Sequence, residues 1–192
     1  TYNTTTKLYS LNGLTDITEE QMINIYNYTA VMIKASSWNE AFNGVNFRTN
    51  IQGTNKGNLT IQASYSFQQN AHLEVFKMDG GVYLSATINM FYNCPALREV
   101  NFIYMQIASA SVAIAMFQNC PALVTCNLRN LKVNLSFAWS PLLSLASLQY
   151  LIQYRGNGTT PITITVHPSV FAKLTDNTNY PTWYAVNQDA LT

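Results

Sequence analysis

Hydrophobic positions recur along the middle of this chain with a period near 25 residues. Three segments, which begin at Phe67, Phe91 and Phe117, each carry a Leu six residues after the Phe and apolar residues three and five places after that Leu. The last two segments also share the letters Phe-x-Asn-Cys-Pro-Ala-Leu, 26 residues apart. Weaker copies begin at Phe42 and Leu142. A repeat of this length is typical of arrays in which each unit packs against the next.

The repeated unit predicts one short strand per coil. Its Leu-x-x-apolar-x-apolar spacing matches the leucine-rich repeat, whose units run roughly 20 to 29 residues. Because strand side chains alternate, we expect Val100 and Phe102 to point into the core with one outward residue between them. The sequence therefore predicts an α/β fold, a leucine-rich-repeat right-handed solenoid with a parallel β-sheet on its concave face. We expect the convex side to be mixed helical and extended, with a helical cap at each end.

The pattern divides one domain into three parts. Thr18 and Gln21 form a capping box, which predicts an amphipathic helix over residues 17–26 in the first part. This helix is expected to cover the first coil. The parts are an N-terminal cap (1–35), leucine-rich repeats of about four to five coils (36–155) and a C-terminal cap (156–192).

Four further elements are expected around the coils. The Ala-rich stretch 107–117 predicts a short helix or helical turn on the convex side. After the last repeat, alternating residues predict a strand over 162–166, and segments that begin with proline predict helices over 168–174 and 181–191. We expect Trp183 to cover the open end of the core, because stacked arrays need terminal caps.

Charged residues are scarce, and this narrows the function. Only 10% of the residues are charged, against about 25% in an average soluble domain. Ten Lys and Arg against nine Asp and Glu leave a formal charge of +1, without the basic cluster that nucleic acid requires. The longest apolar run is broken by serines and is too short to cross a bilayer. We therefore expect no nucleic-acid partner and no membrane-spanning segment in this chain.

Neutral polar residues supply the surface instead, with 22 Asn and 33 Ser plus Thr. Such a surface suits an exported bacterial protein, so we expect an extracellular or outer cell-surface location. The chain does not begin with Met. We expect residue 1 to follow a removed leader or a cloning boundary, with any signal or lipoprotein anchor absent from this chain.

The repeat resembles a known bacterial unit. Phe-x-Asn-Cys-Pro-Ala-Leu-x-x-Val-x-Phe is similar to the Ala-Phe-x-x-Cys-x-x-Leu-x-x-Ile unit of BspA-like leucine-rich repeat surface proteins, and residues 163–174 resemble the C-terminal end of such proteins. The resemblance covers roughly residues 38–175. It implies a solenoid secreted by or attached to host-associated bacteria, and a role in adhesion or protein binding rather than catalysis.

Three cysteines are candidates for redox chemistry. Cys94 and Cys120 occupy equivalent places in adjacent coils, where stacked strands about 4.8 Å apart would permit a disulfide. The alternative is a ladder of buried thiols, in which Asn70 fills the same place one coil earlier. Cys126 falls at an inward strand position and is expected in the core.

No sequence motif for hydrolysis or nucleotide chemistry occurs in the chain. His72 falls at a turn and His167 precedes a helix, so both are expected to be structural or solvated. Because the chain also has no Cys-x-x-Cys pair, we expect no metal site and no cofactor. A hydrolase built on Glu74, Asp79 and Glu99 is an alternative that nothing in the spacing selects. We expect the protein not to be an enzyme.

The outward strand positions form the candidate binding surface. They read off the register as a strip on the concave face in which Tyr and Arg, the residue types that dominate binding hot spots, lie among Asn side chains. We expect the strip to bind a host or bacterial surface protein, and a glycan is the alternative ligand. A sheet face that is merely solvated is a further alternative. The sequence does not distinguish a role on a phage from a role on a cell surface. The candidate residues are Lys77, Arg98, Glu99, Asn101, Tyr104, Asn127, Arg129, Tyr150 and Tyr154, with Tyr150 expected on the strand of the fourth copy.

Overall fold

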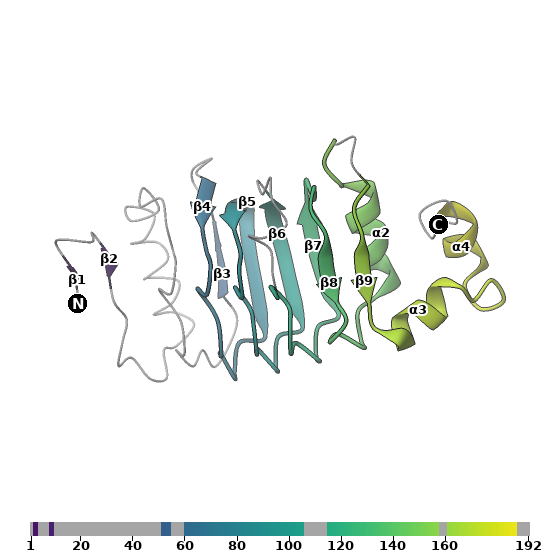
Figure 1. The fold of residues 1–192 in the computed structure, drawn as a ribbon, viewed down its shortest axis with the longest axis horizontal. Helices are drawn as coiled ribbons and strands as arrows, with labels where there is room; N and C mark the ends of the chain where they lie inside the picture. The colour runs from purple at the N-terminus through teal and green to yellow at the C-terminus, as the bar shows by residue number, and fades with distance from the viewer. Residues whose placement is uncertain are drawn as a thin grey trace.

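The computed structural model describes residues 2–3, 8–9, 51–54, 60–105, 115–157 and 161–187. In this part of the chain the fold is mixed α/β, as the repeat pattern predicts (Figure 1). Two short strands, β1 and β2, pair antiparallel near the N-terminus. The elements are β1 (Tyr2–Asn3), β2 (Leu8–Tyr9), β3 (Ile51–Thr54), β4 (Thr60–Gln62), β5 (Val75–Ala86), β6 (Glu99–Met105), β7 (Thr125–Arg129), β8 (Leu135–Phe137), α2 (Leu145–Gln153), β9 (Ile164–Val166), α3 (Pro168–Leu174) and α4 (Pro181–Asn187).

Five strands form one curled, parallel sheet in the order β3–β5–β6–β7, with β4 beside the second half of β5. The register aligns the repeat: Phe76 lies opposite Val100, and Val100 lies opposite Cys126. All three side chains are buried on the same face of the sheet. Residues that match in the repeat are therefore neighbours in space, and the opposite face of β5, β6 and β7, here called the outer face, carries the candidate binding residues.

The strands depart from simple alternation at β-bulges. Between the inward pairs Val100–Cys126 and Ile103–Leu128, β6 has one residue more than β7. An extra residue reverses the alternation beyond it. For this reason Ile103, which is fully buried, takes the second inward position that the alternation assigned to Phe102. The side chain of Phe102 itself lies outside the described part of the structure.

A column of phenylalanine rings runs through the core. Phe91 stacks on Phe67 with ring centroids 5.6 Å apart and on Phe117 at 5.7 Å, and Phe117 stacks on Phe137 at 5.2 Å. All four rings are buried. Phe76 packs against this column, 5.1 Å from Phe67 and 5.3 Å from Phe91. Burial of each ring contributes about 1.5–3 kcal/mol, so the first residue of the repeated motif ties each coil to the next.

The Asn of the repeated motif has a backbone role. Asn93 and Asn119 adopt φ of 57° and 58°, and Gln69 holds the equivalent place with φ of 62°. This left-handed region is unfavourable for most residues, but Asn tolerates it better than other non-glycine residues do. The turn that leads into each strand therefore has the same bend in successive copies, so that equivalent residues of neighbouring coils stay aligned.

The fourth copy forms a helix where we predicted a strand. Leu148 and Leu151 are buried, as the repeat requires, but they lie on α2. Their spacing of three residues fits both the step from a turn into a strand, as in the other copies, and one face of a helix. The predicted start of this copy, Leu142, is wrong: it is 56% exposed, and Phe137 holds the place of Phe91 and Phe117 in the ring column. Ser144 begins the helix, because its side chain accepts a hydrogen bond from the Ser147 backbone N–H. The expected strand that would carry Tyr150 is therefore replaced by a helix.

Helix α2 covers the last edge of the sheet. It packs against β7 (Figure 1). The Ser147 hydroxyl accepts a hydrogen bond of 2.9 Å from the Cys126 backbone N–H. A sheet edge leaves N–H groups without partners, which invites pairing with another chain. A side chain of α2 thus satisfies a donor that a further strand would otherwise take.

The C-terminal elements follow the sequence prediction closely. The strand expected over 162–166 is β9, which pairs in parallel with β8. The helices expected over 168–174 and 181–191 are α3 and α4, although α4 is described only to Asn187. Trp183 is half-buried against the core, and its indole N–H donates to the Leu145 carbonyl at 3.1 Å. The helix predicted over 17–26, the copy at Phe42 and most of 107–117 lie outside the described residues.

Candidate functional site

Three outer-face residues lie in one row across the ends of β5, β6 and β7. The register places Tyr83 opposite Tyr104, and Tyr104 opposite Arg129. The two tyrosine rings stack, with centroids 4.7 Å apart and an angle of 17° between the ring planes. Both rings are half-buried. The sheet itself thus sets the spacing between these side chains.

Helix α2 completes the row with two more tyrosines. Tyr150 and Tyr154 are one helical turn apart, and their ring centroids are 4.5 Å apart. The end of the helix is held against the end of β7, because the Asn130 backbone N–H donates to the Tyr154 carbonyl at 2.8 Å. Gly156 allows this close approach: a Cβ atom there would lie 2.6 Å from the Asn130 Oδ1 atom.

Arg129 lies at the centre of the tyrosines. Its guanidinium carbon is 4.7 Å from the Tyr154 ring centroid, 5.4 Å from that of Tyr104 and 5.6 Å from that of Tyr150. Its Nε–H donates to the Tyr150 hydroxyl, and its Nη1–H donates to the Tyr104 hydroxyl at 3.1 Å. The hydrogen bond to Tyr150 raises the pKa of Arg129 above its ordinary value. We call this group of Arg129, Tyr83, Tyr104, Tyr150 and Tyr154 the Arg129 cluster.

The cluster contains four of the predicted binding residues. Tyr104 and Arg129 lie on the expected strands, whereas Tyr150 and Tyr154 reach the same place from a helix and its C-cap. Sequence reasoning missed Tyr83. It stands only 21 residues before Tyr104, because the register shifts between Lys77 and Val82. A period near 25 does not align the two tyrosines.

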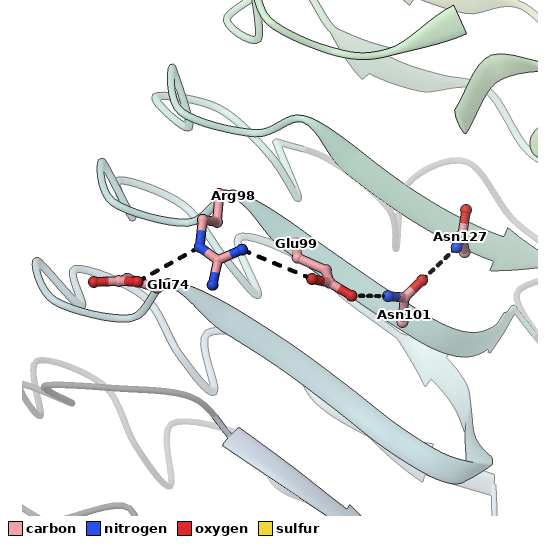
Figure 2. Close-up of polar contacts among 5 residues, drawn as sticks. All are labelled: Glu74, Arg98, Glu99, Asn101 and Asn127. Carbon is pink, nitrogen blue, oxygen red and sulfur yellow. Dashed lines mark hydrogen bonds and ion pairs between the residues drawn. The ribbon is translucent and has the colours of Figure 1, made fainter. Parts of the chain in front are cut away.

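Four other predicted residues lie with Glu74 in a second group, which we call the polar chain (Figure 2): Arg98, Glu99, Asn101 and Asn127. Arg98 pairs with Glu74 (Nε to Oε2, 3.5 Å) and with Glu99 (Nη1 to Oε2, 3.9 Å). The Asn101 amide donates to the other Glu99 oxygen, and the Asn127 amide donates to the Asn101 oxygen. Acid, base and amide side chains therefore follow one another from coil to coil.

Each charged side chain of the polar chain has an ion-pair partner within the protein. Arg98 has two carboxylate partners, and Asn101 is only 7% exposed. Lys77, the remaining predicted residue, is half-buried and lies opposite Asn101 in the register. The predicted strip is thus divided into a self-paired part and the Arg129 cluster.

The cysteines are free thiols that hydrogen-bond between coils. Cys94 donates to the Phe67 carbonyl at 3.1 Å, and Cys120 donates to the Phe91 carbonyl at 3.0 Å. Asn70, at the equivalent place, is buried and donates to the turn carbonyl of Phe67 at 2.6 Å, a bond within its own coil. Burial raises the pKa of Cys120 to about 12, and it also raises the pKa values of Cys94 and Cys126. A thiol that stays protonated is a poor nucleophile.

The histidines have structural surroundings. His167 caps α3, where its Nδ1 atom accepts a hydrogen bond of 3.2 Å from the Ser169 backbone N–H. His72 is exposed in a turn. Among the residues with assigned positions, no three His, Cys, Asp or Glu side chains come together as a metal site would require. Likewise, none of the described helices is both long and apolar enough to cross a membrane.

A groove of about 600 Å³ lies at the C-terminal end, between the start of α2, the end of α3 and the start of α4. Its walls include Leu142, Leu145, Tyr180 and Trp183, with Lys173 at one side. The groove was not predicted from the sequence.

No protein-family model, curated protein or solved structure shows significant similarity to this chain.

Proposed function

We propose that the chain is a leucine-rich-repeat solenoid of the BspA-like type that recognises a protein partner through the outer face of its sheet, as a binding module without catalysis. The Arg129 cluster is the centre of that surface. The observation that carries the proposal is a half-buried arginine, Arg129, that is surrounded by tyrosines and has no carboxylate partner in the described part of the chain. Tyr and Arg are the residues most enriched where binding energy is concentrated.

The cluster is ordered before any partner arrives. Tyr83, Tyr104 and Arg129 are aligned by strand pairing, and Tyr154 is held by its backbone hydrogen bond to Asn130. Binding therefore orders few side chains, and each immobilised side chain would otherwise cost about 0.5–1.5 kcal/mol. Tyrosine also offers apolar area and a polar end on a side chain with few rotatable bonds. A rigid group of this kind supports recognition rather than turnover.

An outer cell-surface or extracellular setting supports the same proposal. Low charge and abundant Asn, Ser and Thr suit that setting, and so does the resemblance of the repeat to surface-protein repeats. The partner is then a host or bacterial surface protein.

A glycan is the second candidate, because two aromatic rings flank one cation. Tyr104 and Tyr154 both contact the Arg129 guanidinium, and Tyr154 is 38% exposed. Aromatic faces accept the C–H faces of sugar rings, and guanidinium groups donate to their hydroxyls.

Capture of partners by the immobilised chain tests the proposal. The bait is presented to mucosal extract and to bacterial surface fractions, beside the Tyr104→Ala/Arg129→Ala double variant. Because the double substitution removes the cluster's cation and one ring, we expect at least a tenfold loss of the captured protein. The matched control is Glu74→Gln/Arg98→Gln, which changes the polar chain on the same face and should keep full capture. Equal capture by the cluster variant contradicts the proposal, and a glycan array screened in parallel tests the second candidate.

A further inference from the structure

We infer that the Arg129 cluster is a carboxylate-binding site, which takes an Asp or Glu side chain of the partner protein. The inference rests on the proposed function and specifies the chemistry of the partner at that site. It follows from three observations: which hydrogen-bond donors the cluster leaves over, which charge it leaves unbalanced, and how the rings shield that charge.

The cluster has hydrogen-bond donors that it does not use itself. A guanidinium carries five N–H groups. One on Nε and one on Nη1 donate to the hydroxyls of Tyr150 and Tyr104, and the other three make no hydrogen bond to any residue of the described ranges. Each phenol oxygen accepts from Arg129 and keeps its own O–H to donate. The group therefore presents N–H and O–H donors together, as a ligand made of acceptors requires.

The charge of the cluster is unbalanced within the described chain. The ion pairs found there on the outer face join Arg98 to Glu74 and Glu99, and none reaches Arg129. Arg129 is surrounded by neutral phenols instead. An arginine stays charged at any physiological pH, so an anion gains here a charge interaction that the protein itself does not provide.

The tyrosine rings favour a planar, two-oxygen anion. The Tyr154 ring centroid lies 4.7 Å from the Arg129 guanidinium carbon. The ring therefore excludes water from one side of the guanidinium, and charge interactions at the remaining edge become stronger. The planar guanidinium fork matches a carboxylate, which can accept two parallel hydrogen bonds. Beside it, the stacked rings of Tyr83 and Tyr104 offer an apolar surface for a neighbouring side chain. An acidic residue next to an apolar one in a protein segment supplies both contacts.

The test compares a small probe that carries one carboxylate with an uncharged analogue. The full chain, labelled with ¹⁵N, is titrated at constant ionic strength with the blocked dipeptide N-acetyl-Glu-Phe-amide and with its Gln analogue. We expect the Arg129 Nε–H resonance to shift with saturation for the Glu probe and at least tenfold weaker binding of the Gln probe. Arg129→Lys keeps the charge but loses the fork, so binding should fall about tenfold. Tyr104→Phe/Tyr150→Phe keeps both rings but removes two O–H donors, and binding should fall about threefold.

Controls separate this inference from the proposed function. Arg98→Gln removes the other arginine of the outer face and should leave binding of the Glu probe unchanged. Equal binding of the Glu and Gln probes, or an Arg129 resonance that does not move, overturns the inference. Tighter binding of galacturonate than of the Glu probe overturns the protein source in favour of an acidic glycan. If the immobilised chain captures a partner that an excess of the Glu probe does not displace, the proposed function stands and the carboxylate site fails.

Discussion

Two arginines on one sheet face, Arg98 and Arg129, have opposite surroundings. Arg98 lies between two carboxylates that continue into a line of amides, and every charge in that line has a partner within the protein. Arg129 lies between aromatic rings, and its hydrogen-bond partners among the described residues are the hydroxyls of Tyr150 and Tyr104. The first group joins one coil to the next, whereas the second leaves a charge and several donors for another molecule. An arginine on this face therefore either stabilises the fold or can bind another molecule, and its neighbours decide which.

The largest expected effect removes the support that both regions share. Phe117→Ala deletes a ring stacked between Phe91 and Phe137, and such a cavity costs about 3–5 kcal/mol of unfolding free energy. Urea denaturation followed by circular dichroism measures the change. The matched control is Phe171→Ala, whose ring is 52% exposed and whose loss should change stability by less than about 0.5 kcal/mol. Similar shifts for both variants would contradict the ring column as the common support.

A smaller effect concerns the thiol ladder beneath both regions. The pKa of Cys120 is about 12 in the folded protein, against about 8.5 in an unfolded chain. Above that lower value the unfolded state releases a proton that the folded state keeps, so stability should fall as pH rises from about 8.5 to 12 and should be unaffected below. The slope is at most about 1.4 kcal/mol per pH unit for one thiol.

Cys120→Ser isolates this slope. Serine occurs at the equivalent place in the last coil, where Ser140 donates to the Cys120 carbonyl at 3.1 Å. The variant keeps a donor but does not titrate in this range, so its urea midpoint should depend less on pH than that of the original chain. An unchanged dependence between pH 8.5 and 10.5 would argue against a protonated thiol at this position.

The smallest effect sharpens the comparison itself. The double variant Glu74→Gln/Glu99→Gln removes both carboxylate partners of Arg98. Arg98 then resembles Arg129, for which the described residues provide no carboxylate. The side chains of Arg98 and Glu74 are 51% and 49% exposed, and exposed ion pairs contribute about 0–1 kcal/mol. Thermal unfolding should therefore change by no more than a few degrees. Because none of the described tyrosines packs on Arg98 as three do on Arg129, this variant should gain no second site for the Glu probe. A second saturable site would show that an unpaired arginine alone suffices.

The sequence predicted the stacking of coils better than the form of each coil. The shared letters after Phe91 and Phe117 correctly placed these two rings next to each other. They did not distinguish a strand from a helix at Leu148 and Leu151, because a spacing of three residues fits both. Only tertiary packing against the edge of β7 selects the helix.

The candidate site was predicted in part for the same reason. Tyr104 and Arg129 lie opposite each other on neighbouring strands, so the repeat brings them together. Tyr83 was missed because a bulge in β5 changes its distance from Tyr104 along the chain. Pairing between side chains also escapes a one-dimensional pattern: nothing in the spacing of Arg98 and Arg129 indicates that one meets carboxylates and the other meets phenols.

The junction between β7 and α2 sets how often this surface can occur. Arg129 comes from the last strand of the sheet, and Tyr150 and Tyr154 come from the helix that closes it. Insertion of further coils between β5 and β6 would lengthen the row of paired side chains, yet would still produce a single such junction. Valency would then stay at one for each unit of this kind while the unit grew longer, and multivalent attachment would require several such units.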